Sequence, residues 1–102
     1  MTDRELLERA AKAAGYEYAK HGGYIVVDGI PGNWNPLTDD GDALRLAVKL
    51  KLKVYQGDLV AIVHPRMSHA YIAEEYERNG DHYAATRRAI VRAAAEIGKG
   101  MQ

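Results

Sequence analysis

The chain has 102 residues with equal numbers of basic and acidic side chains, 14 of each, so we expect one domain over residues 1–102 and no global field that attracts a polyanion. The absence of cysteine excludes disulfides, thiolate catalysis and sulfur-dependent zinc sites, and agrees with a reducing cytoplasm. The N-terminus lacks an apolar leader and the longest apolar run, residues 59–63, is too short to span a bilayer, so we expect a soluble, non-exported protein without a membrane partner.

The first helix is predicted over residues 3–14. Thr2 followed by Glu5 is a capping-box pattern, and apolar residues then recur on one helical stripe until a glycine ends it. Residues 16–20 and 24–28 flank "HGG" and predict an antiparallel hairpin. The segment "GIPGNWNP" that follows is rich in helix and strand breakers, so it predicts a loop.

A second helix is predicted over residues 40–51. Thr38 or Asp39 would cap its N-terminus, because both side chains accept hydrogen bonds from free amides of the first turn. Asp40 and Asp42 would then lie in that turn, where the helix dipole favours carboxylates. The apolar spacing predicts a buried stripe made of Ala43, Leu44, Ala47, Val48 and Leu50.

The second half of the chain predicts three strands and a long helix. Residues 52–56 and 59–63 surround Gly-Asp and predict another hairpin, and residues 69–76 predict a fifth strand. Asp81 is the expected cap of a final helix over residues 82–97.

These elements predict an α+β fold with a mainly antiparallel sheet of about five strands and three helices, in the order α-β-β-α-β-β-β-α. Residues 59–63 are apolar at every position, which is typical of a strand covered on both faces. The pattern therefore favours an α/β/α sandwich. The alternative is a two-layer structure with all helices on one face of the sheet.

Trp34 and Asn35 are the first candidates for binding a partner. A tryptophan in a polar loop can fold back as a plug that fills the edge of the core, or it can project as an interaction anchor. If it is a plug, Asn35 should form the turn that leads into the second helix.

The aspartates at the start of the second helix suggest a rival function. Asp39, Asp40 and Asp42 could bind a hard cation, or Asp39 and Asp42 could form an enzymatic site with a histidine. However, the spacing does not match a calcium-binding loop, and helix capping explains all three residues. The four histidines of the chain fall at predicted turns and strand ends: His21, His64, His69 and His82. We therefore expect no metal, no cofactor and no catalytic residue.

The last helix carries a basic stripe that could contact a partner or nucleic-acid phosphates. Arg88 and Arg92 lie on the side opposite its small apolar residues, with Arg87 beside them. A solvated face is the alternative, and Glu96 lies four residues after Arg92, where it could form an ion pair. Nucleic-acid binding through this stripe is thus the second alternative function, and we expect none at physiological salt.

Two stretches, "WNPLTDDGDALRLAVKL" and "DHYAATRRAIVRAAAEIG", cover about a third of the chain. In their order and separation they resemble small α/β/α sandwich proteins encoded by bacteriophages and prophages, and the layout is also similar to that of NinX-type phage proteins. The resemblance implies a phage accessory protein that acts in the bacterial cytoplasm, and it transfers no catalytic residue. We therefore expect a non-catalytic binding protein that acts on a protein partner or on a second copy of itself.

Overall fold

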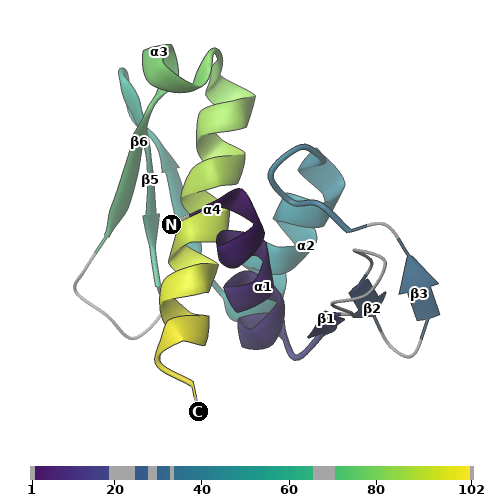
Figure 1. The fold of residues 1–102 in the computed structure, drawn as a ribbon. Helices are drawn as coiled ribbons and strands as arrows, with labels where there is room; N and C mark the ends of the chain where they lie inside the picture. The colour runs from purple at the N-terminus through teal and green to yellow at the C-terminus, as the bar shows by residue number, and fades with distance from the viewer. Residues whose placement is uncertain (1, 19–24, 28–29, 33, 66–70, 102) are drawn as a thin grey trace.

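A computed structural model describes residues 2–18, 25–27, 30–32, 34–65 and 71–101. In chain order its elements are α1 (Asp3–Ala14), β1 (Glu17–Tyr18), β2 (Ile25–Val27), β3 (Ile30–Gly32), α2 (Asp40–Leu50), β4 (Lys53–Gln56), β5 (Val60–His64), β6 (Ile72–Glu75), α3 (Tyr76–Asn79) and α4 (His82–Lys99) (Figure 1).

The three predicted helices form at the predicted places because their ends are capped by nearby residues. The Thr2 side chain accepts a hydrogen bond from the backbone N–H of Glu5 at the start of α1. Asp39 is the cap of α2, and Asp81 caps α4 by accepting from the N–H of Ala84. Such caps satisfy amides that have no partner within the helix, so local sequence determines where each helix begins.

Helix α4 is the middle layer of the fold. The sheet formed by β4, β5 and β6 lies against one side of it, and α1 packs against another side together with α2 (Figure 1). Because α4 is covered on more than one side, small residues fill most of its buried positions, which are Ala85, Ala89, Ile90, Val91, Ala93, Ala94, Ala95 and Gly98. None of the described helices combines the length and hydrophobicity that a bilayer-spanning segment needs.

The predicted five-stranded sheet with three helices is wrong. Among the described residues there are four helices and two separate antiparallel sheets, each of three strands, in the orders β1-β2-β3 and β4-β5-β6. The extra strand β3 forms within the segment predicted as a loop, where it pairs with β2. The extra helix α3 is a single turn that follows β6 directly. Local patterns do not reveal which strands share a sheet, because strand pairing depends on residues far apart in the chain.

The α/β/α sandwich is also wrong, because the described helices do not cover both faces of the second sheet. Ala61 and Val63 of β5 are buried against α4, whereas the alternate residues Val60, Ile62 and His64 are only partly buried. Tyr55, which pairs with Ile62 on the outer face, is 53% exposed. The sheet therefore has one covered face, as in the two-layer alternative, although every residue of 59–63 is apolar.

The predicted buried stripe of α2 is partly wrong. Ala43 and Ala47 are buried as expected, and Leu46 is fully buried although it was not in the predicted stripe. Leu44 and Val48 are instead 63% and 68% exposed. Apolar residues surround most of this helix, so periodicity alone does not show which side meets the core.

Candidate functional site

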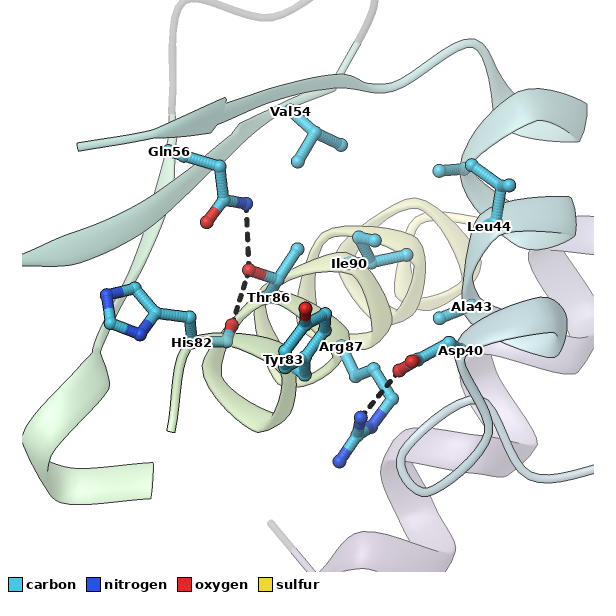
Figure 2. Close-up of a pocket in the computed structure, with 11 residues that line it drawn as sticks. Asp40, Ala43, Leu44, Val54, Gln56, His82, Tyr83, Thr86, Arg87 and Ile90 are labelled. Carbon is cyan, nitrogen blue, oxygen red and sulfur yellow. Dashed lines mark hydrogen bonds and ion pairs between the residues drawn. The ribbon is translucent and has the colours of Figure 1, made fainter. Parts of the chain in front are cut away.

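An open groove of about 620 Å³ lies between α2, β4 and α4. Ala43 and Leu44 contribute to its wall from α2, Val54 contributes from β4, and Ile90 and Tyr83 contribute from α4 (Figure 2). Apolar side chains thus line much of the groove, although the elements that supply them are far apart in sequence.

Several large apolar side chains around the groove are exposed to solvent. Leu44 on α2 and Tyr83 on α4 are 63% and 68% exposed, and Val54 on β4 is 38% exposed. Val48, one helical turn after Leu44 on α2, extends this apolar surface. Single exposed apolar residues are normal on proteins, but a contiguous group beside a concave surface is typical of a binding site.

The polar side chains of the groove form hydrogen bonds with one another. Arg87 donates from Nη1 to Asp40 Oδ1 over 2.6 Å and from Nε to the carbonyl of Leu37. Gln56 donates from Nε2 to Thr86 Oγ1 over 2.8 Å (Figure 2). These bonds hold α2 and β4 against α4. The apolar part of the groove lies between the Arg87–Asp40 pair and the Gln56–Thr86 pair. Such an arrangement suits the burial of apolar groups.

Trp34 and Asn35 contribute to the structure that precedes α2. Trp34 is partly buried against the core, and its ring meets that of Tyr16 edge to face with 5.7 Å between centroids. The Asn35 backbone N–H donates to Asp42 Oδ2, and Asn35 Oδ1 accepts from the N–H of Leu37, each over 3.0 Å. Asn35 is therefore the turn-forming residue expected of a plugged loop, and these contacts favour the plug interpretation of Trp34.

The two arginines predicted to bind a partner lie in intramolecular ion pairs. Arg88 donates to Asp3 Oδ1 over 3.1 Å. Arg92 pairs with the buried carboxylate of Glu74 on β6, whereas its expected partner Glu96 is exposed. The stripe thus connects α4 to α1 and to the sheet, and its charge is largely compensated. No described contact brings these arginines together with Trp34 and Asn35.

The aspartates at the start of α2 act as caps and ion-pair partners. Asp39 accepts from the N–H of Asp42 over 2.8 Å, and Asp42 Oδ1 accepts from Arg45 Nη2 over 2.8 Å. The hydrogen bond from Arg45 to Asp42 raises the pKa of the exposed Arg45 guanidinium. In the part of the chain that the structure describes, no three acidic or histidine side chains form a group that could hold a metal ion.

The described histidines contact tyrosines. The His64 ring lies 5.6 Å from that of Tyr55 and 5.7 Å from that of Tyr71, and the His82 ring lies 4.0 Å from that of Tyr76. His21 and His69 lie outside the described residues. The site of Asp39, Asp42 and a histidine is therefore not assembled by any described contact.

The groove residues Leu44, Val54 and Tyr83 were not among the sequence candidates. One signal was available, because α2 carries more apolar residues than one buried stripe needs, and Leu44 and Val48 form the surplus. Comparison of the chain with protein-family models, curated proteins and solved structures finds no match.

Proposed function

We propose that the chain is a non-catalytic binding protein that holds an apolar segment of a protein partner in the groove between α2, β4 and α4. The observation that carries this proposal is the exposure of Leu44, Val54 and Tyr83 around an open apolar space. Covering these side chains would remove apolar surface from water, which stabilises a complex by about 25 cal/mol for each Å² buried. The assignment to a phage or prophage accessory protein rests on the sequence resemblance alone.

The charges near the groove support a polypeptide with acidic residues as the occupant. Lys51 and Lys53 lie where the chain passes from α2 into β4, at one end of the groove, and Lys53 belongs to the outer face of the sheet with Tyr55. Both are exposed, and neither is in an ion pair among the described residues. Their ammonium groups complement carboxylates placed beside the apolar part of the partner. Duplex nucleic acid is less suited to this surface, because Arg87, Arg88 and Arg92 are already paired with carboxylates.

The proposal can be tested with a yeast-displayed library of random peptides. The peptides are about 12 residues long, which is enough for a strand or about three helical turns. We expect the selected peptides to be apolar with an acidic end. Leu44→Asp should weaken their binding at least about 30-fold. The charged side chain would remove the apolar contact of Leu44 with the peptide, and we expect that contact to contribute about 2 kcal/mol or more to binding. Titration with the synthetic peptides measures the loss.

Tyr71→Asp is the matched control, because Tyr71 is 60% exposed but does not line the groove. It should leave peptide affinity within about twofold of wild type, since substitutions outside an interface are nearly neutral. Peptides that bind Leu44→Asp as tightly as wild type would contradict the proposal. Sedimentation of the protein alone provides a further test: a dimer that Leu44→Asp dissociates would assign the groove to a second copy of the chain instead.

A further inference from the structure

The outer edge of β4 presents unpaired backbone groups beside the groove. Among the described strands, β4 pairs only with β5, so its other edge has no strand partner. The backbone N–H of Gly57 donates to the carbonyl of Val60 over 2.9 Å, which makes these two residues a hydrogen-bonded pair at the turn. Hydrogen-bonded and non-hydrogen-bonded pairs alternate along an antiparallel ladder. The N–H and C=O groups of Gln56 and Val54 therefore point away from β5.

The same two residues direct their side chains into the groove. Val54 and Gln56 line it (Figure 2). Tyr55 lies between them in the strand, so it belongs to the outer face of the sheet with its pair Ile62. A strand added at this edge would place alternate side chains between β4 and α2, next to Leu44. One added strand could therefore form backbone hydrogen bonds with the edge of β4 and place its alternate side chains in the groove. Peptides that bind by strand addition use both kinds of contact.

We propose that the partner segment binds as an extended strand, antiparallel to β4, with hydrogen bonds to the backbone of Val54 and Gln56 and apolar side chains in the groove. This inference rests on the proposed function and adds the conformation and direction of the bound segment. The C-terminal end of an antiparallel strand lies beside the start of β4, where Lys51 and Lys53 are exposed. The segment therefore carries its acidic residues after its apolar ones.

A helical occupant satisfies this surface less well. A helix with its side chains is about 10–12 Å across and forms its backbone hydrogen bonds internally. Lying in the groove, it would shield the outward N–H and C=O groups of β4 from water without bonding to them, which is unfavourable. A strand satisfies the same groups directly.

The first test compares Gln56→Pro with Gln56→Ala, with the peptides selected by the library as probes. Both variants lose the Gln56 side chain, but only proline also removes the outward N–H. Proline is tolerated on edge strands where the N–H faces solvent. We expect Gln56→Pro to bind about 5- to 10-fold more weakly than Gln56→Ala, which corresponds to one lost hydrogen bond. Equal affinities in folded variants would overturn the strand geometry.

A second test does not depend on the stability of a variant. Each peptide is N-methylated at one position at a time, and affinity for the wild-type protein is measured. Methylation at alternate positions should reduce affinity at least about 10-fold, because every second amide of an added strand faces β4. Tolerance of methylation at consecutive central positions would overturn the inference.

The failures of the two proposals are distinguishable. Peptides that do not respond to Leu44→Asp contradict the groove as a binding site. Peptides that require Leu44 but show no alternation on N-methylation retain the groove and contradict only the strand geometry.

Discussion

The crossing of α1 and α4 should be highly sensitive to the substitution Gly98→Ala. A Cβ atom on Gly98 would lie 1.9 Å from the carbonyl oxygen of Arg9 and 2.8 Å from its carbonyl carbon. Both are backbone atoms of α1, so no change of side-chain rotamer relieves the contact. The helices must separate by about 1 Å or more, which loosens the packing of the buried alanines between them.

The expected loss of stability follows from two opposing effects. Overpacking lowers the free energy of unfolding by about 3 kcal/mol when backbone must move. Replacing glycine by alanine in a helix raises it by about 1 kcal/mol. The free energy of unfolding should therefore fall by about 2 kcal/mol, which lowers the melting temperature by about 8–16 °C in a domain of this size. Thermal and urea unfolding followed by circular dichroism measure both quantities.

Gly100→Ala is the control for this experiment. Gly100 has a negative φ of −79°, and the nearest atom to its added Cβ is 3.6 Å away. Its stability should stay within about 0.5 kcal/mol of wild type. A Gly98→Ala protein as stable as wild type would refute the close approach of the two helices.

Three further substitutions test side chains that the sequence suggested as partner contacts. Trp34→Ala should lower the free energy of unfolding by about 2–3 kcal/mol, somewhat less than for a fully buried tryptophan, because its ring is only partly buried against Tyr16 and the core; an unchanged melting temperature would make Trp34 an interaction anchor. Arg92→Ala should cost about 1–3 kcal/mol because it leaves the buried Glu74 carboxylate without its cation. Arg88→Ala, which frees a carboxylate that is 66% exposed, should cost less than about 1 kcal/mol; equal losses in urea unfolding would contradict the difference in burial.

The elements that depend on neighbouring residues could be predicted from the sequence. The starts of α1 and α2 follow from caps that join residues three positions apart, at Thr2 and at Asp39. The hairpin of β4 and β5 was predicted for the same reason, because its turn is only a few residues long. The turn-forming role of Asn35 was likewise visible as a loop pattern.

The layering of those elements could not be predicted, because it depends on long-range packing. Residues 59–63 are apolar throughout, and this pattern indicates a strand without showing whether one face or both faces are covered. The alanine-rich sequence of α4 agrees equally with a helix on the surface of a sheet and with one between a sheet and other helices. Packing places α4 in the middle, and no described helix covers the outer face of the second sheet.

The groove depends wholly on this packing. Leu44, Val54 and Tyr83 belong to three different elements, and α4 lies far from α2 and β4 in the sequence. On α2, apolar side chains occupy more than one helical face, so periodicity could not show that Leu46 is buried and Leu44 is exposed. That choice depends on which side of α2 faces α1 and α4, because burial against these helices is a long-range contact that no local pattern encodes.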